Sequence, residues 1–218
     1  MKEYKDTEHY KKLRTRLVND IRDKGIDDKK VLQAIHTIPR QFFMPSELED
    51  MAYEDRPFPI GEGQTISQPY TVAYQTELLD VQPTDRILEI GTGSGYQAAV
   101  LAVLAGEVFS LERQKKLFEK HREFNYLKQF DNLYLFYGDG FEGLPEYAPF
   151  DRILITAAAP YVPSKLLEQL KWSGKMVLPL GEGKTQQMAR ITKLDNGEIM
   201  EEYFHNFSFV PMLTGKKE

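Results

Sequence analysis

Cysteine is absent from this chain of 218 residues. Its absence excludes a disulfide framework, a thiolate zinc site and a cysteine nucleophile. Histidine is scarce, with four residues in the whole sequence, and no two of them have the short spacing that is typical of metal ligands. We therefore expect no metal site.

Long apolar runs and an excess of positive charge are also missing. No run approaches the roughly 20 apolar residues that span a bilayer, and the first ten residues contain no apolar signal-peptide core. The formal net charge is −5, whereas a broad nucleic-acid surface usually needs a basic excess. The basic stretch at 113–120 is interrupted by Leu117 and Phe118, which indicates a solvated helix face. We expect a cytoplasmic protein with no nucleic-acid or membrane partner.

The residues that are present support a folded chain. Hydrophobic residues make up 41% and charged residues 28%, a balance that permits a packed core. The length suits one α/β domain with a modest extension. We expect one domain over residues 1–218, with N-terminal helices and an irregular segment over 1–80 and the main sheet over 81–218.

The N-terminal part predicts two helices and an ordered loop. Apolar residues recur at helical spacing over 6–24, and a second helix follows Asp27 and Asp28, which can cap it. This helix ends near Pro39, which cannot donate to a continuing helical ladder. The segment 40–69 is rich in proline, glycine and aromatic residues. We expect an ordered loop there, because so long a connection without regular structure usually carries function.

From residue 84 onward, strands and helices alternate. Successive β-α-β units predict a parallel twisted sheet that is covered by helices on both faces. After Gly181 the apolar pattern changes to a period close to two, and Asn196-Gly197 favours an antiparallel hairpin between 188–194 and 203–210. The other expected strands are 86–90, 107–111, 132–137, 151–156 and 175–180, and the expected helices are 96–105, 113–128 and 163–170.

The segment 91–95 joins the first of these strands to a helix, and its three glycines alternate with Thr92 and Ser94. A glycine turn lets a ligand approach backbone that a Cβ would obstruct. In a doubly wound sheet this turn lies at the carboxyl edge of the strands, where ligands bind. A tight turn without a ligand is the alternative, but three alternate glycines between a strand and a helix favour a binding site.

The residues around this turn favour a nucleoside ligand without a phosphate. The dinucleotide fingerprint needs glycine or alanine at its sixth position, where Tyr96 stands. Glu89 precedes the turn, and a negative charge there would disfavour a pyrophosphate. Glu112 follows the second strand, about 20 residues after Gly91, where a carboxylate can accept hydrogen bonds from both ribose hydroxyls. An adenosyl sulfonium, which carries no phosphate, satisfies these conditions.

A third element, Gly138-Asp139-Gly140, follows the third strand. Gly-Asp-Gly by itself is a common turn. Since the carboxyl ends of parallel strands meet at one edge of the sheet, Asp139 and Gly140 are candidate contacts for the adenine amino group.

Together these elements resemble the Rossmann-like class of S-adenosylmethionine-dependent methyltransferases. The block at 59–70 (PIGEGQTISQPY) is similar to the signature of the protein-L-isoaspartate O-methyltransferases, and the resemblance extends from about the second helix to the C-terminus. It implies an α/β fold with a doubly wound, mostly parallel sheet, N-terminal helices and a C-terminal antiparallel hairpin. The other similar segments are 87–96 (ILEIGTGSGY), 156–160 (TAAAP), 178–181 (LPLG) and 209–212 (FVPM).

The resemblance also implies a reaction and its residues. The cofactor is S-adenosyl-L-methionine, the product is S-adenosyl-L-homocysteine, and the acceptor is the free α-carboxylate of isoaspartyl residues in damaged proteins. Ser67 matches the active-site serine of the family, and Val210 and Pro211 are implied to lie near the substrate. The implied cofactor contacts are Thr65, Ile66, Ser67, Gln68, Gly91, Thr92, Gly93, Ser94, Gly95, Glu112, Asp139 and Gly140.

Two positions depart from the family pattern. Some members have histidine where this chain has Val72, so a polar contact is missing there. Some members have threonine directly after a Val-Pro-Leu stretch, whereas here Met212 is followed by Leu213 and only then by Thr214. The resemblance therefore defines the C-terminal wall of the cofactor pocket least well.

This reaction needs few chemical groups. An α-carboxylate has a reference pKa of roughly 3.5, so the acceptor is ionised at neutral pH and needs no general base. We expect Ser67 to donate a hydrogen bond that aims the carboxylate, not to act as a nucleophile. The alternative for Ser67 is a helix cap, because Pro69 follows it and an apolar-periodic run over 72–79 comes next.

Two other functions stay open from the sequence. A methyltransferase of small molecules or RNA shares the elements at 91–95, 112 and 139 but has no reason to carry the block at 59–70. A noncatalytic adenosyl-binding module would retain the glycines without turnover. We expect a monomeric enzyme whose partners are isoaspartyl-containing proteins and peptides.

Overall fold

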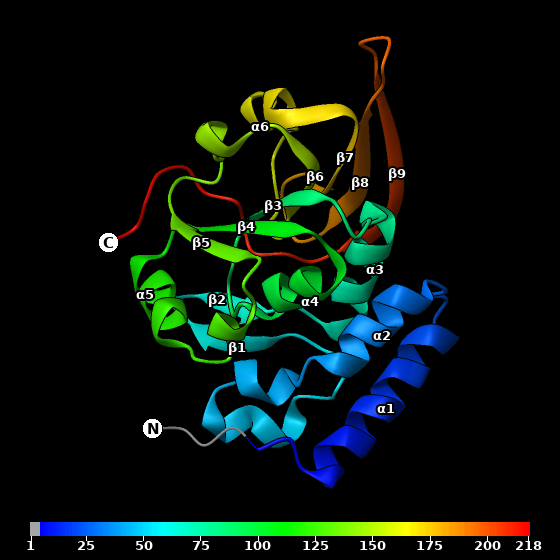
Figure 1. Cartoon of the computed structure of the whole chain (residues 1–218), viewed down its shortest axis with the longest axis vertical. Coiled ribbons are helices and arrows are strands. Elements are labelled where there is room, and N and C mark those ends of the chain that lie inside the picture. Colours follow the sequence, from blue (N-terminus) through cyan, green and yellow to red (C-terminus); the bar gives the residue numbers. More distant parts are fainter. Residues whose placement is uncertain (1–4) are drawn as a thin grey trace.

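The computed structural model describes residues 5–218, and a seven-stranded sheet lies at its centre. The strand order is β5-β4-β3-β6-β7-β8-β9. The pairings from β5 to β7 are parallel, and β8 and β9 add antiparallel strands at one edge. This confirms the expected doubly wound, mostly parallel sheet with a C-terminal antiparallel hairpin (Figure 1).

The elements follow in chain order. The helices are α1 (Glu8–Asp23), α2 (Lys29–Thr37), α3 (Pro69–Leu79), α4 (Tyr96–Leu104), α5 (Lys115–Glu123) and α6 (Ser164–Gln169). The strands are β1 (Phe58–Gly61), β2 (Gln64–Ile66), β3 (Arg86–Ile90), β4 (Glu107–Glu112), β5 (Leu133–Tyr137), β6 (Phe150–Ile155), β7 (Leu170–Leu180), β8 (Gln186–Lys193) and β9 (Ile199–Phe207).

Alternating side chains of the central strands form two apolar layers. Ile87 of β3 is buried with Val108 of β4 in a cluster that also contains Leu101 of α4. The next residue, Leu88, is buried on the opposite face in a cluster that contains Leu166 of α6. Both faces of the sheet are therefore covered, as a parallel sheet requires, and its carboxyl edge stays available for a site.

The N-terminal helices form a further layer on the α4 side of the sheet (Figure 1). Leu17 and Ile21 of α1 are buried at helical spacing, as expected from the sequence. Asp28 caps α2, since its Oδ1 accepts a hydrogen bond from Lys30 N at 2.7 Å. Within residues 5–218, no helix is long and apolar enough to cross a membrane.

The segment 40–69 contains more regular structure than the expected loop. It has two 3-10 turns, Arg40–Phe43 and Ser46–Met51, followed by the antiparallel hairpin of β1 and β2. The hairpin turns at Glu62 and Gly63, both with positive φ. Its strands have four and three residues, too few for a period of two to be visible in the sequence.

Two expected elements end elsewhere. The helix expected over 113–128 is confined to α5, because Phe124 turns away to pack edge-on against Phe43 and Leu127 packs beneath Gly95. The last strand, expected over 203–210, is β9 and ends at Phe207. The residues that follow leave the sheet and form part of the site described below.

Candidate active site

The glycine turn between β3 and α4 adopts a conformation that needs glycine. Gly91, Gly93 and Gly95 have φ values of +96°, +56° and +84°, which other residues rarely adopt. A Cβ on Gly91 would lie 2.6 Å from Thr156 Oγ1. That hydroxyl lies 2.7 Å from Gly91 O and 3.0 Å from Ile90 O, where it serves as donor. Thr156, which follows β6, therefore fixes the start of the turn.

Glu112 at the end of β4 faces the same turn. Its Oε2 accepts a hydrogen bond from Gly93 N at 2.9 Å, and its Oε1 accepts one from Gln114 N at 2.8 Å. Burial raises the pKa of this carboxyl, and hydrogen bonds from the backbone of Gln114, Gly93 and Arg113 oppose that rise. Each oxygen keeps a lone pair for a further donor, as the proposed binding of two ribose hydroxyls requires.

A buried hydrogen-bonded chain supports the turn from beneath. Thr92 Oγ1 lies 2.7 Å from Ser110 Oγ, and Ser110 donates to Glu89 Oε2. Glu89 is fully buried, and burial raises its pKa to about 8, with a smaller contribution from the charge of Glu112. The raised pKa favours the neutral form of Glu89, which argues against the expectation that a negative charge at this position repels a pyrophosphate.

The raised pKa of Glu89 predicts a pH-dependent stability. A folded-state pKa above the ordinary value means that the folded protein holds this proton more tightly than the unfolded chain. The contribution of Glu89 to stability is therefore fully present below the ordinary pKa of a glutamate. It is lost as the pH rises through about 8. Between pH 6.5 and 8 the free energy of unfolding should fall by about 1–2 kcal/mol in the wild type. This window avoids His121, whose pKa burial lowers to about 4.

The variant Glu89→Gln should remove most of this slope, because the amide does not titrate and its oxygen can still accept from Ser110. Urea unfolding of both proteins at several pH values measures the difference. Equal slopes in the two proteins would show that another group is responsible.

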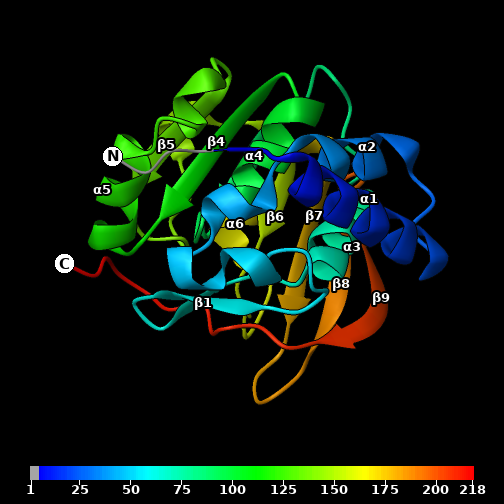
Figure 2. The ribbon, with the colours of Figure 1, turned by 90° about the horizontal axis from the view of Figure 1, so that it is seen from below.

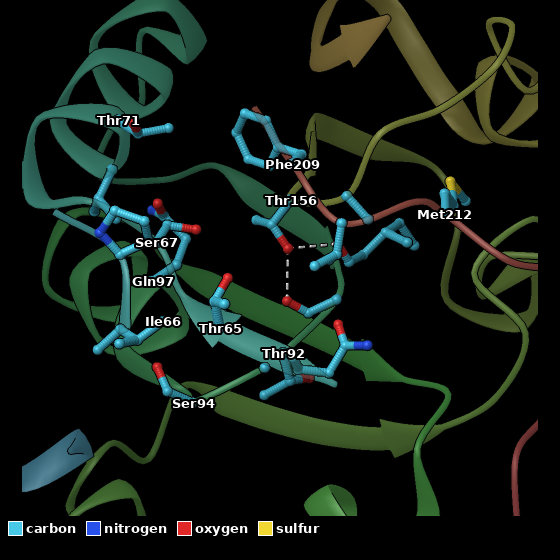
Figure 3. A pocket seen from close by; sticks show the side chains of 18 of the residues that line it. Thr65, Ile66, Ser67, Thr71, Thr92, Ser94, Gln97, Thr156, Phe209 and Met212 are labelled. Atoms are coloured by element: carbon cyan, nitrogen blue, oxygen red, sulfur yellow. Dashed lines mark hydrogen bonds between the residues drawn. The ribbon is translucent and has the colours of Figure 1, made fainter. Parts of the chain in front are cut away.

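The loop that carries Ser67 lines the same cavity as the glycine turn and adjoins that turn, since a Cβ on Gly93 would lie 3.9 Å from Thr65 O. It connects β2 to α3, and Figure 3 shows Thr65, Ile66 and Ser67 together on one side of the cavity. The N-cap of α3 is Gln68, not Ser67, and the side chain of Gln68 makes no cap hydrogen bond. Within residues 5–218 the Ser67 hydroxyl has no hydrogen-bond partner. Ser67 therefore does not cap α3 in this structure.

The C-terminal segment after β9 forms the remaining wall. Ala158 N donates to Val210 O at 2.8 Å, and Met212 N donates to Ala158 O at 2.7 Å. These bonds hold Val210 and Pro211 at the cavity, which residues of β2 also line. Figure 2 shows the segment that follows β9 running alongside β1. Leu213 also lines the cavity and is 48% exposed, so the departure from the family pattern lies at the rim.

The cavity that these segments enclose has a volume of about 490 Å³, within the usual range for small-molecule sites. The lining side chains that the sequence did not mark as site residues include Thr71, Gln97, Thr156 and Phe209 (Figure 3). Thr156 and Phe209 lie in the segments 156–160 and 209–212 that resemble the family. Gln97 had a detectable signal, since it is a lone polar residue near the start of an apolar helix. The implied site residues that line the cavity are Thr65, Ile66, Ser67, Gln68, Gly91, Thr92, Gly93, Ser94, Glu112, Gly140, Val210 and Pro211.

Asp139 and Gly95 do not line this cavity. The carboxylate of Asp139 accepts hydrogen bonds from Phe141 N at 2.9 Å and from Gly215 N at 2.6 Å. It therefore ties the C-terminal segment to the end of β5. Gly95 begins α4, and a Cβ there would lie 2.9 Å from Leu127 Cδ1. A glycine at this position therefore lets Leu127 pack against the start of α4.

The residues present fit an adenosyl sulfonium. The glycine turn leaves backbone exposed at the cavity, and Glu112 provides acceptors beside it. Tyr96 fills the sixth position of the turn and packs edge-on against Phe43 at 5.5 Å. A bulky ring there is incompatible with the close helix packing of a dinucleotide site. In the part of the chain that the structure describes, no three His, Asp or Glu side chains converge as metal ligands.

Comparison with known proteins agrees with this geometry. The family model of protein-L-isoaspartate(D-aspartate) O-methyltransferase matches residues 12–218. The chain belongs to this family. The protein-L-isoaspartate O-methyltransferase of Cytophaga hutchinsonii is 52% identical over 215 residues, which cover 97% of this chain and 95% of that protein. That of Flavobacterium psychrophilum is 50% identical over 212 residues, with 97% and 99% covered.

Solved structures of this family share the fold. A Plasmodium falciparum structure, described as a protein-L-isoaspartate O-methyltransferase in complex with S-adenosyl-L-homocysteine, superposes with a TM-score of 0.79 at 27% identity. The alignment covers 92% of this chain and 98% of that chain. A further protein-L-isoaspartate O-methyltransferase superposes with a TM-score of 0.79 at 28% identity, and this chain spans 65% of its length.

Proposed function

We propose that this protein is a repair methyltransferase. It transfers a methyl group from S-adenosyl-L-methionine to the free α-carboxylate of L-isoaspartyl residues in damaged proteins and releases S-adenosyl-L-homocysteine. One observation carries the proposal: in a chain that matches the family from residue 12 onward, the Ser67 loop and the glycine turn line one cavity. The block at 59–70, which marks the family in the sequence, contains this loop.

The cofactor is held by the carboxyl ends of β3 and β4. Gly91 and Gly93 let it approach the backbone, and Glu112 accepts hydrogen bonds from its ribose. The bound cofactor supplies an electrophilic methyl group on a sulfonium. The other cofactor contacts in the proposal are Thr65, Ile66, Ser67, Gln68, Thr92, Ser94 and Gly140. Asp139 acts indirectly, through the C-terminal segment that it anchors.

The chain contributes orientation to the reaction. The acceptor carboxylate is already ionised at neutral pH, so no residue has to remove a proton from it. The unpaired hydroxyl of Ser67 donates to one carboxylate oxygen and directs the other toward the methyl group. Orientation of this kind supplies roughly 7–11 kcal/mol in favourable systems. Apolar side chains such as Ile66, Phe209 and Met212 exclude water from the cavity.

The substrate enters beside Val210 and Pro211. In an isoaspartyl residue the main chain runs through the side-chain carbonyl, so the α-carboxylate projects freely. Esterification makes this group a better leaving group, and the neighbouring backbone nitrogen then closes a succinimide without further catalysis. Hydrolysis of the ring returns part of the population to normal aspartate. The proposal includes a monomer that acts in the cytoplasm on proteins and peptides, without a nucleic-acid or membrane partner.

The test is a matched pair of peptides, one with isoaspartate and one with aspartate at the same position. With methyl-labelled cofactor, label should enter the isoaspartyl peptide as a base-labile ester and leave the aspartyl peptide unlabelled. Transfer to neither peptide, with intact cofactor binding, would refute the proposed function and favour the noncatalytic alternative.

Removal of the Ser67 hydroxyl tests its role in orientation. Ser67→Ala should lower kcat for the isoaspartyl peptide about 10- to 100-fold and leave the Kd of the cofactor within about threefold of the wild type. Turnover and cofactor titration on the same preparation measure both quantities. A wild-type kcat would remove Ser67 from the mechanism.

A further inference from the structure

Asp55 lies outside the cavity but directly behind two residues that line it. Its Oδ1 accepts a hydrogen bond from Tyr70 N at 2.8 Å. Its Oδ2 accepts hydrogen bonds from Gln68 Nε2 at 3.1 Å and from Lys24 Nζ at 2.5 Å. The side chain of Asp55 is 12% exposed, so these partners meet a largely buried carboxylate.

The first turn of α3 depends on this carboxylate. The opening N–H groups of a helix have no partner inside the helix, and Pro69 at the first position has no N–H at all. The N-cap residue Gln68 does not satisfy the turn with its side chain. Asp55, 15 residues before Tyr70 in the chain, accepts from the second N–H instead. Its negative charge also suits the positive end of the helix dipole.

Ser67 stands immediately before this turn. Because its hydroxyl has no partner within residues 5–218, the direction of the side chain is set by the backbone on either side of it. On the C-terminal side, that backbone is held by the contacts of Asp55 with Gln68 and Tyr70. On the other side it is held by the pairing of Ile66 with Phe58.

We propose that Asp55 is a positioning residue for methyl transfer, which fixes the direction of the Ser67 hydroxyl by holding residues 68–70. This inference rests on the proposed function, since Ser67 must first orient a substrate carboxylate. Lys24 contributes little, because its side chain is 49% exposed and ion pairs of this kind are weak. The contacts that matter are those with the loop and α3.

The test compares Asp55→Ala with the wild type on the isoaspartyl peptide. We expect kcat to fall about 10- to 100-fold, because a displacement of about 1 Å at a reacting group has an effect of this size. The KM for S-adenosylmethionine should rise much less than kcat falls, since the glycine turn and Glu112 are unchanged and only the contact of Gln68 loses its anchor. A residue with only a structural role would not produce this split between kcat and KM.

Two controls separate positioning from stability. Asp28→Ala removes the same kind of aspartate cap from α2, away from the cavity, and should lower the thermal stability with kcat unchanged. Lys24→Met removes the ion pair and keeps both loop contacts, so its kcat should also match the wild type. Asp55→Asn keeps an acceptor for Tyr70 N but loses the charge, and its kcat should fall only about two- to fivefold.

The outcomes are distinct. A wild-type kcat in Asp55→Ala, with a stability loss like that of Asp28→Ala, would make Asp55 a cap alone and overturn the inference. If Asp55→Ala does not fold, Asp55→Asn carries the test, and a wild-type kcat there overturns it equally. Absence of turnover in the wild type would instead reject the proposed function, and the positioning role would fall with it.

Discussion

Gly91→Ala should weaken the binding of S-adenosylmethionine by about 100-fold or more, equivalent to about 3 kcal/mol. The φ of +96° at this position strains any residue with a Cβ. The new Cβ would also lie 2.6 Å from Thr156 Oγ1, a hydroxyl held by its hydrogen bonds to the backbone of Ile90 and Gly91. Neither atom can move without displacing the turn. Isothermal titration with the cofactor measures the loss.

Gly25→Ala is the matched control for this prediction. Gly25 has a φ of +101°, and no atom lies within 4 Å of a Cβ built there. The two variants therefore share the backbone strain, about 1–3 kcal/mol in stability, and differ in the steric clash. Gly25→Ala should retain the cofactor affinity of the wild type. Equal affinity losses in both variants would mean that general destabilisation, not the shape of the turn, controls binding.

Glu112→Gln should have an effect of similar size on cofactor affinity, about 100-fold. The wild-type carboxylate accepts from Gly93 N and Gln114 N at once. An amide offers one oxygen and one NH2, so its NH2 must face one of these N–H donors. The variant thereby loses a charged acceptor for the ribose and leaves a buried donor unpaired, each worth about 1–3 kcal/mol. Titration with S-adenosylmethionine and with S-adenosylhomocysteine measures the change.

Glu107→Gln provides the control on the same strand. Glu107 begins β4, is 41% exposed and pairs with Arg86 Nε at 2.8 Å. Its replacement should leave cofactor affinity unchanged, because the cavity lies at the opposite end of the strand. If Glu112→Gln also bound cofactor with wild-type affinity, the ribose contact would have to be assigned to another residue.

The sequence predicts the parallel sheet well because its signals are local. Each buried strand is a short apolar run. The three alternate glycines at 91–95 predict a turn with positive φ values. The pairing of this turn with Glu112 also follows from spacing, since the order of β3 and β4 in a doubly wound sheet puts both at one edge. The structure contains this arrangement.

The features that the sequence does not predict depend on contacts between distant segments. The sequence alone suggests that Glu89 is charged, whereas its complete burial in the fold raises its pKa. Asp55 is one acidic residue among many until the fold brings it to the first turn of α3. Asp139 has the position expected for a ligand contact, but its carboxylate accepts a hydrogen bond from Gly215 N of the C-terminal segment. Tertiary structure assigns these roles.

The C-terminal wall has a consequence for the order of events during synthesis. Translation releases the glycine turn and Glu112 well before residues 206–213, which complete the cavity. A nascent chain can therefore pair its first strands while the site still lacks one side. Tight retention of the cofactor must wait until β8 and β9 have emerged and the segment after them has paired with Ala158. Partly synthesised copies of this protein should accordingly leave the cellular supply of the methyl donor untouched.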